Sequence, residues 1–216
     1  MKLIRLVGYL ATSASLIAFH GGPACALPVI SEIMYDGIGS DAPFVFTEIY
    51  GTAGLDLTGW ALVGVNGFNG LEYRTLDLTG AVIPPDGILV VATSSALGDV
   101  LAARDFTGSV DWQNGPDAVW LRDATGTIVD AIQYGDAGSF NAGEGTPAPD
   151  AAAGWSLARA DLLTDFGDNF ADFELLDVPT PGHIPGSNPE PVPEPATMFL
   201  TGLGLVAVGG FRRVRR

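Results

Sequence analysis

Short runs of β-type residues, each bounded by a cluster of turn residues, dominate the sequence between residues 28 and 178. The runs are rich in Val, Ile, Thr, Phe and Tyr, and the clusters between them consist of Gly, Asp, Asn and Pro. Such runs predict strands, and the bounding clusters predict tight turns. The predicted strands are Val29–Tyr35, Phe44–Tyr50, Gly59–Val65, Gly70–Leu76, Gly87–Ala92, Ala118–Arg122, Thr127–Tyr134 and Trp155–Arg159.

Amphipathic helix is nearly absent from this pattern. Only SSALGDVLAAR at residues 94–104 is expected to form one or two helical turns, with Ser94 or Ser95 as the N-cap. The run Ala118–Leu121 is apolar on both faces, which indicates a central strand. Pro84–Gly87 and Asp123–Gly126 predict tight turns between strands. Many short strands with little helix are typical of a two-sheet β-sandwich, so the sequence predicts an all-β fold.

The basic residues are concentrated at the two ends of a chain whose formal net charge is −15. Lys2 and Arg5 lie at the start and four arginines at the end. The interior has four arginines and no lysine, set against every acidic residue except Glu194. The four are Arg74, Arg104, Arg122 and Arg159. A body this negative repels phosphate backbones, so no nucleic acid is expected among its partners.

The first 26 residues have the three parts of a secretory signal peptide. A short positive region precedes the apolar stretch Leu6–Phe19, and Ala24 and Ala26 fit the A-x-A cleavage pattern. An N-terminal membrane helix is the alternative, but Gly21-Gly22-Pro23 ends the apolar run short of a full span. Lipidation of Cys25 is disfavoured because the aliphatic residue expected before a lipidated cysteine is missing. Cleavage after Ala26 removes the only cysteine, so the mature chain is expected to have no disulfide.

A proline-rich linker and a short apolar run end the chain. Residues 179–195 contain seven prolines, which excludes helix and inner strand and predicts an extended linker. As a helix, Ala196–Phe211 would be about 24 Å long, against a hydrocarbon core of roughly 30 Å. This run therefore fits a segment that attaches the chain to the membrane temporarily. It fits a permanent anchor or a buried globular helix less well. The basic cluster behind it would keep the end in the cytoplasm and the acidic body outside; it consists of Arg212, Arg213, Arg215 and Arg216.

Few residues of the mature chain suit catalysis. His183, its only histidine, lies in the TPGH segment of the linker, where nucleophile–histidine chemistry would lack a rigid orienting partner. Zinc sites need His or Cys ligands that the body lacks. Carboxylates are plentiful enough for paired-carboxylate catalysis, but no motif nominates a pair. The chain is therefore expected to be a non-enzyme without a cofactor.

Three acidic residues of the segment DLLTDFGDNFADFE are weak calcium candidates: Asp165, Asp168 and Asp172. An EF-hand loop needs an acidic or amide side chain at its third position and Gly at its sixth. Counted from Asp165, Gly167 occupies the third position, and the sixth is not Gly. A solvated acidic loop is the better-supported alternative.

Seven segments of the body occur in the order typical of one family. They are VISEIMYDG, FVFTEIYG, DLTGWALVG, IPPDGILVVA, NGPDAVWLRDATGTIVDAIQYGD, GWSLAR and TPGHIPGSN. In this order they resemble the lamin tail domain, an immunoglobulin-like sandwich of nuclear lamins and many bacterial secreted proteins. The resemblance covers residues 28–188 and departs from the family pattern at two positions. Phe46 stands where the family usually has an acid, and Gly51 where it usually has Asn.

Four residues in these segments are expected to serve the scaffold. Trp60 and Trp120 are predicted core aromatics, because each can bury a large apolar area. Asp117 and Asp123 bracket a predicted strand, where their carboxylates can accept hydrogen bonds from turn amides.

The last 25 residues resemble the PEP-CTERM sorting signal. Val192, Pro193, Glu194 and Pro195 supply the motif, residues 196–211 the membrane segment and the arginines the basic cluster. In that family an exosortase, a membrane transpeptidase-like enzyme, recognises the motif. Its proteins are typically exported by Gram-negative bacteria that make extracellular polysaccharide, and they are sorted to the cell surface or matrix.

These features together predict a non-enzymatic exported surface module. The Sec machinery and signal peptidase would export it across the inner membrane, residues 196–211 would hold it there, and an exosortase would process it. At the cell surface or outside the cell, the sandwich would contact surface proteins or extracellular polysaccharide. The alternative is a surface module that binds calcium or carbohydrate through its acidic loops.

Overall fold

The computed structural model describes residues 27–136 and 138–184. The predicted cleavage site at Ala26, the sorting motif at residues 192–195 and the membrane segment at residues 196–211 lie outside these residues. Among the described residues, no helix is long and apolar enough to cross a membrane.

All eight predicted strands are present, and their bounds shift by no more than two residues at either end. The structure adds two short strands, β6 and β10, and the short helix α2, while α1 forms within the stretch 94–104 that was expected to be helical. In chain order the elements are β1 (Val29–Met34), β2 (Phe46–Tyr50), β3 (Ala61–Asn66), β4 (Glu72–Asp77), β5 (Ile88–Ala92), α1 (Gly98–Ala103), β6 (Phe106–Thr107), β7 (Asp117–Arg122), β8 (Ile128–Tyr134), β9 (Ser156–Arg159), α2 (Asn169–Asp172) and β10 (Phe173–Leu176).

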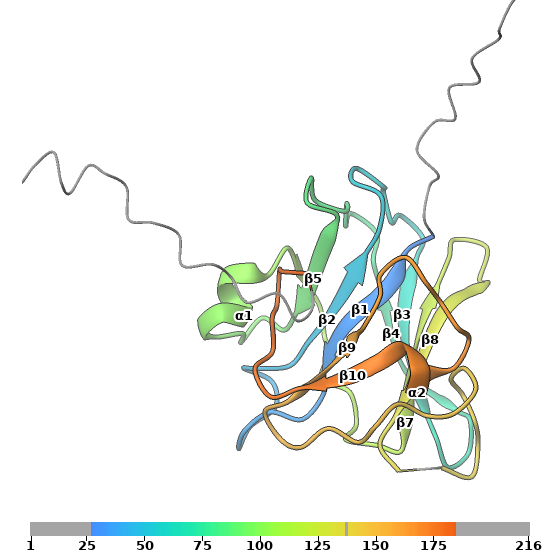
Figure 1. The fold of residues 1–216 in the computed structure, drawn as a ribbon. Coiled ribbons are helices and arrows are strands. Elements are labelled where there is room, and N and C mark those ends of the chain that lie inside the picture. The colour runs from blue at the N-terminus through green and yellow to red at the C-terminus, as the bar shows by residue number, and fades with distance from the viewer. Residues whose placement is uncertain (1–26, 137, 185–216) are drawn as a thin grey trace, which may run out of the picture.

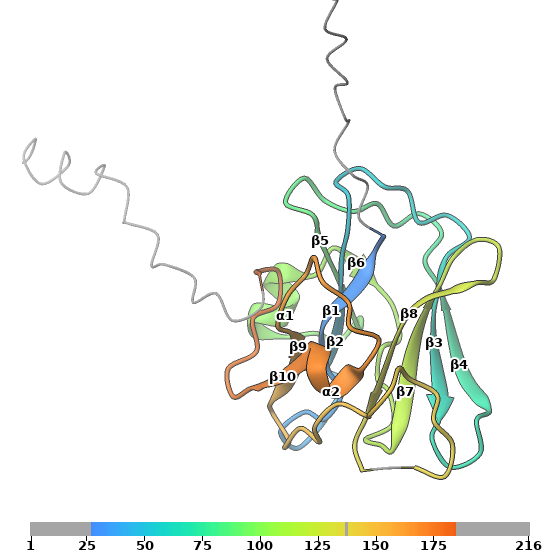
Figure 2. The ribbon, with the colours of Figure 1, turned by 45° about the vertical axis from the view of Figure 1, so that its right-hand side comes forward.

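The strands form two sheets that pack face to face, which confirms the predicted all-β sandwich (Figures 1 and 2). The larger sheet has the order β10-β9-β1-β2-β5-β6, and the smaller sheet has the order β4-β3-β7-β8. All strand pairs are antiparallel except β5 with β6. The strand predicted to be central, β7, lies inside the smaller sheet. The edge strand β4 exposes or half-exposes all its residues, with charged side chains that disfavour pairing with another sheet.

The main core lies between the sheets, because alternate residues of each strand point inward. Ile33 and Ile49 come from the larger sheet, and Leu62 and Leu121 from the smaller one. Each of these four side chains is fully buried. Tyr35 and Tyr134 stack across the core with ring centroids 4.0 Å apart.

Helix α1 lies against the outer face of the larger sheet (Figure 2). A second apolar cluster is buried between this helix and the sheet. Phe46 belongs to it, with Val90 and Val100. This explains the departure from the family pattern at Phe46, because an apolar side chain is favoured where a helix covers the sheet. The predicted N-cap at Ser94 or Ser95 is wrong. The helix begins later, with Leu97 at the N-cap and no capping side chain, because residues 93–96 first form a turn.

The tryptophan at the centre of the sandwich is Trp112, which the sequence pattern did not single out. Its side chain is 2% exposed, and its Nε1 donates a hydrogen bond of 2.9 Å to Thr47 Oγ1. Trp60 is only partly buried at the edge of the main core, and Trp120 packs against the outer face of the smaller sheet. The prediction of Trp60 and Trp120 as core aromatics is therefore only half right. Trp112 lies in an irregular segment, where no periodicity marks a residue as inward-facing.

Asp117 and Asp123 both accept hydrogen bonds from backbone amides of loops, as predicted. Asp123 accepts from Thr125 N and Thr127 N at 2.8 and 2.9 Å and so organises the hairpin between β7 and β8. Asp117 is buried and accepts from Gly67 N at 3.2 Å.

Candidate functional site: an acidic cluster around Arg159

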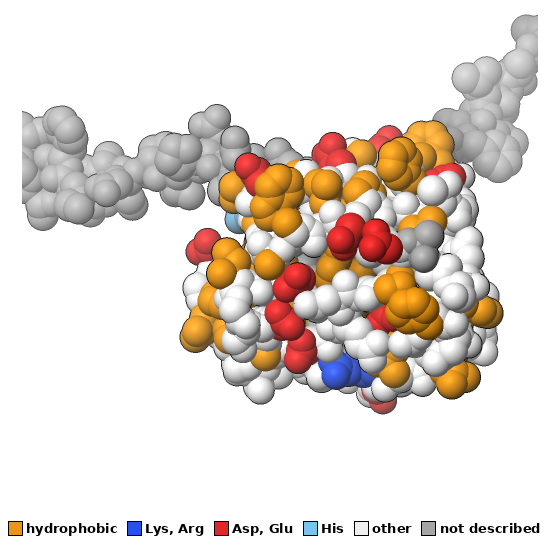
Figure 3. All heavy atoms as spheres, turned by 90° about the horizontal axis from the view of Figure 1, so that it is seen from below, with side chains coloured by type: hydrophobic (Ala, Val, Ile, Leu, Met, Phe, Trp, Pro, Cys, Tyr) orange, Lys and Arg blue, Asp and Glu red, His pale blue; other side chains and the backbone are white. Residues whose placement is uncertain are grey.

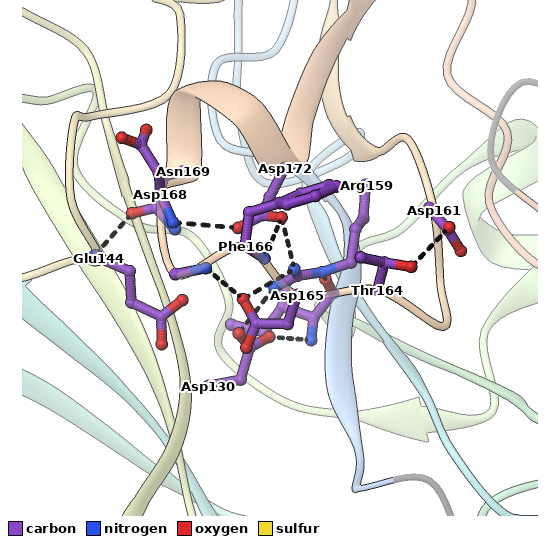
Figure 4. A network of polar contacts seen from close by, with 12 residues as sticks. Asp130, Glu144, Arg159, Asp161, Thr164, Asp165, Phe166, Asp168, Asn169 and Asp172 are labelled. Carbon is purple, nitrogen blue, oxygen red and sulfur yellow. Dashed lines mark hydrogen bonds and ion pairs between the residues drawn. The ribbon is translucent and has the colours of Figure 1, made fainter.

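One of the four interior arginines lies inside the sandwich. In β9 the residues alternate, so that Ser156 and Ala158 face outward while Leu157 and Arg159 face the other sheet. The Arg159 side chain is 1% exposed. Its Nη2 donates a 2.7 Å hydrogen bond to Asp130 Oδ1 on β8, and its Nε donates to the Ile30 carbonyl on β1 at 3.2 Å. Arg159 therefore ties the two sheets together (Figure 4).

Two further carboxylates approach the other end of the guanidinium (Figure 4). Arg159 Nη1 lies 3.6 Å from Asp172 Oδ1 and 3.7 Å from Asp165 Oδ1, and it makes no hydrogen bond. The ring of Phe173 packs against the guanidinium, with 4.7 Å from Cζ to the ring centroid. We call Asp130, Glu144, Asp165, Asp172 and Arg159 the Arg159 cluster.

The three predicted calcium residues take separate places in this region. Asp165 belongs to the Arg159 cluster and opens it to solvent, since its side chain is 44% exposed. Asp172 is buried, and it accepts a 2.9 Å hydrogen bond from Phe166 N. Asp168 instead caps α2, accepting from Phe170 N at 3.1 Å. The structure thus brings two of the three to one guanidinium and assigns the third to a local turn.

A different set of carboxylates meets the distance requirement for a metal ion. One oxygen each of Asp130, Glu144 and Asp165 lies within 4.8 Å of the others. Only Asp165 of this set was a candidate from the sequence. Asp130 and Glu144 come from β8 and from the loop after it, 35 and 21 positions before Asp165, and no local spacing links them. A signal that could have pointed to the region is Arg159, an arginine in a strand that is otherwise free of charged residues.

Burial and mutual repulsion govern protonation here. Burial, together with the charges of Asp130 and Asp165, raises the pKa of Glu144 to about 7. One oxygen of Glu144 is buried without a hydrogen-bond partner. Burial also raises the pKa of Asp130, while the Arg159 guanidinium works against that rise. The cluster thus has more carboxylates than its one arginine neutralises, and Glu144 titrates near neutral pH.

An asparagine joins this region to the edge of the smaller sheet. Asn169, in α2, is fully buried. Its side chain donates to the Ala131 carbonyl at 2.7 Å and accepts from Gln133 N at 2.9 Å, along the free edge of β8. The same oxygen accepts from Glu144 N at 3.0 Å. Asn169 thereby covers an edge strand and positions Glu144 beside Asp130.

Comparison with known families identifies the family of the sandwich. The Lamin Tail Domain profile matches residues 23–136, more than half of the chain. The chain belongs to the lamin tail domain family. The match ends two residues after β8, so β9 and β10 complete the larger sheet of the lamin tail domain beyond the matched stretch. Arg159 thus comes from outside that stretch and Asp130 from inside it.

A second profile, the PEP-CTERM protein-sorting motif, matches residues 191–216. This motif implies export and processing by sorting machinery of the exosortase type. Both family resemblances predicted from the sequence are thus confirmed. Searches of curated proteins and of solved structures gave no match.

Proposed function

We propose that this lamin tail domain protein is a non-enzymatic module of the cell surface or extracellular matrix. The observation that supports this most directly is the pairing of two family matches on one chain, a lamin tail domain match at residues 23–136 and a sorting motif at residues 191–216. Signal peptidase removes residues 1–26 after Sec export. Residues 196–211 then hold the chain in the inner membrane until the exosortase acts at the Val192–Pro195 motif. The processed domain presents its loops to surface proteins or extracellular polysaccharide.

Apolar side chains at one end of the sandwich offer a contact surface. Phe68 and Leu71, in the turn between β3 and β4, are 63% and 66% exposed. Phe140, in the loop after β8, packs its ring over Gly70, where a Cβ would come within 2.7 Å of it. This end belongs to the face seen in Figure 3, where apolar side chains lie among acidic ones. Exposed aromatic faces and acidic groups are suited to stacking and hydrogen bonding with sugars or polar protein surfaces.

The sorting part of the proposal is tested by two glutamates of the linker, each of which lies between prolines. Glu194 lies in the proposed motif, and Glu190 lies in the same context four positions earlier. We expect Glu194→Ala to reduce the surface-exposed fraction of the protein by at least about tenfold, because the sorting enzyme reads this side chain in an extended segment. Digestion of the surface protein by protease added to intact cells that carry the full chain measures that fraction, because the mature chain has no lysine for amine-reactive labelling.

Glu190→Ala is the matched control, and we expect it to reach the surface as the wild type does. A double Glu190→Ala, Glu194→Ala variant that still reaches the surface would contradict sorting through this segment. Hydrolysis of a matrix polysaccharide by the purified protein, abolished by one carboxylate substitution, would contradict the non-enzymatic role.

Calcium binding at the Arg159 cluster is the second candidate function, supported by the 4.8 Å grouping of Asp130, Glu144 and Asp165. Carboxylate oxygens are the ligands that Ca²⁺ prefers, and Asp165 offers a solvent-facing entry. If the site binds calcium, calorimetric titration of the protein with CaCl₂ gives saturable heat that Asp165→Asn abolishes. Asp161→Asn is the control, since Asp161 is exposed in the same loop and accepts a hydrogen bond from Leu163 N. A titration without heat contradicts this second function.

A further inference from the structure

Two buried glutamates lie side by side on the outer face of the larger sheet. Glu32 on β1 and Glu48 on β2 are direct partners in the antiparallel register, and both are 0% exposed. Partners in this position have Cβ atoms about 5 Å apart, and like charges there are destabilising. Because the site is closed to water, the repulsion is poorly screened and each charged carboxylate also loses its hydration. Two negative charges on this pair are therefore unfavourable.

The C-terminal strap, residues 178–184, covers this pair. Thr180 N and Thr180 Oγ1 donate to the two oxygens of Glu32, at 2.9 and 2.7 Å. Gly182 N donates to Glu48 Oε2 at 2.9 Å. The sheet itself adds one donor to each carboxylate, Ser156 Oγ to Glu32 at 2.6 Å and Ser31 Oγ to Glu48 at 2.7 Å. Three of the five hydrogen bonds that hold the pair thus come from a segment outside the strands.

The strap fits into a narrow space between α1 and β5. Gly182 has φ +79°, and a Cβ there would lie 3.0 Å from Ala103 Cβ. In Figure 1 this is the red-orange end of the ribbon beside α1. Most of the strap is the first part of the predicted Pro-rich linker, and the rest of that linker and the sorting signal follow directly in the sequence. The contacts of Thr180 and Gly182 therefore determine where the linker leaves the sandwich.

The charged groups around the pair are mostly negative. His183 on the strap favours the charged form of Glu32, and Asp86, in the turn before β5, disfavours the charged form of Glu48. Other titratable side chains on the elements packed around the pair include Asp99 on α1, Arg104 and Asp105 directly after it, Glu174 on β10 and Asp177 before the strap.

We propose that Glu32 and Glu48 form a proton-dependent clasp, which holds the C-terminal strap while at least one of the two carboxyls is protonated and releases it when both are ionised. Release exposes both carboxylates to water and frees the segment that leads to the sorting signal. Because the domain acts outside the cell, the clasp responds to the external pH.

The raised pKa values of the two glutamates place the opening of the strap near neutral pH. Burial, with a smaller contribution from the charge of Glu32, raises the pKa of Glu48 from 4.5 to about 8. Burial also raises the pKa of Glu32, against the hydrogen bonds from Ser156 and Thr180. With the strap open, Glu48 faces water and its pKa returns toward 4.5. The closed state therefore keeps a proton that the open state loses, so closure weakens as the pH rises from about 4.5 to about 8 and levels off above that.

Hydrogen exchange of the strap tests the clasp in the full-length protein. After correction for intrinsic exchange, we expect the protection of the peptide covering residues 177–184 to fall by up to about tenfold per pH unit between pH 6 and 8. In Glu48→Gln, which keeps an oxygen to accept from Gly182 N but cannot ionise, this protection should not depend on pH. Peptides covering β3 and β7, in the other sheet, should show no such dependence in either protein.

Glu174→Gln is the matched control, because Glu174 is an exposed glutamate on the same sheet; it should keep the wild-type slope. A wild-type strap whose protection is constant across this range contradicts the clasp without any variant. A Glu48→Gln strap with the wild-type slope contradicts it as well. If Glu48→Gln fails to fold, Glu32→Gln tests the same pair: it should move the fall in protection to lower pH, because it removes the Glu32 charge that helps to raise the pKa of Glu48. An unmoved fall in protection would contradict the pairing of the two carboxyls.

Discussion

Replacing Arg159 by leucine is expected to lower the free energy of unfolding by about 3–5 kcal/mol. The substitution leaves Asp130 and Asp172 buried without their cation, and it removes the link that Arg159 makes between β9 and β8. A carboxylate that is buried without a counterion loses its hydration and has no ion pair to compensate for that loss. Urea unfolding followed by circular dichroism measures the effect.

The surface ion pair between Arg122 and Glu72 provides the control. Glu72 is 44% exposed, and Glu72→Gln is expected to cost no more than about 1 kcal/mol because solvent screens the remaining arginine. In a double-mutant cycle, Arg159→Leu with Asp130→Leu should cost less than the sum of the two single changes. An Arg159→Leu protein within 1 kcal/mol of the wild type would show that this arginine does not hold the sheets together.

Replacing Trp112 by alanine is expected to cost about 3–5 kcal/mol, since it empties the centre of the core. The ring is enclosed so tightly that a Cβ on Gly64 would lie 2.9 Å from it. The change also leaves Thr47 Oγ1 without the Trp112 hydrogen bond in a buried site. The same urea experiment applies.

Trp155 is the control for this prediction, because its side chain is 38% exposed. Trp155→Ala is expected to cost about 1 kcal/mol, as ordinary point substitutions do. Equal losses for the two variants would contradict the assignment of Trp112 as the central core aromatic.

The strands could be predicted because their signals are local. Alternating β-type residues and the turns at Pro84–Gly87 and Asp123–Gly126 define each strand within a few positions, and the structure forms both turns. Strand β10 was missed because its residues, FELL, are too few and too exposed to show a pattern. It forms through pairing with β9, and that pairing depends on how the whole sheet is arranged.

The contacts that join distant parts of the chain could not be predicted in this way. Periodicity places Glu32 on one face of a strand, but it does not reveal that Thr180, 148 positions later, will bind it. Arg159 and Asp130 are similarly 29 positions apart and lie in different sheets. Five of the seven family segments contain these residues or Glu48, yet the segments do not show which residue contacts which.

The calcium prediction shows the same limit. Asp165, Asp168 and Asp172 were grouped because they are close in sequence. Folding separates them, since a turn and a short helix direct Asp168 to a backbone amide while Asp165 faces Glu144 and Asp130. The spacing of acidic residues within one loop therefore identified Asp165. It missed Asp130 and Glu144, which come from β8 and the loop after it.

The most direct test of the proposed sorting is the mass of the mature protein, measured in cells with and without the sorting enzyme. With the enzyme, we expect a chain that begins at Leu27 and ends before Ala196. Without it, the chain should begin at Leu27 and keep Arg216. A protein that ends at Arg216 in both kinds of cell would contradict the account.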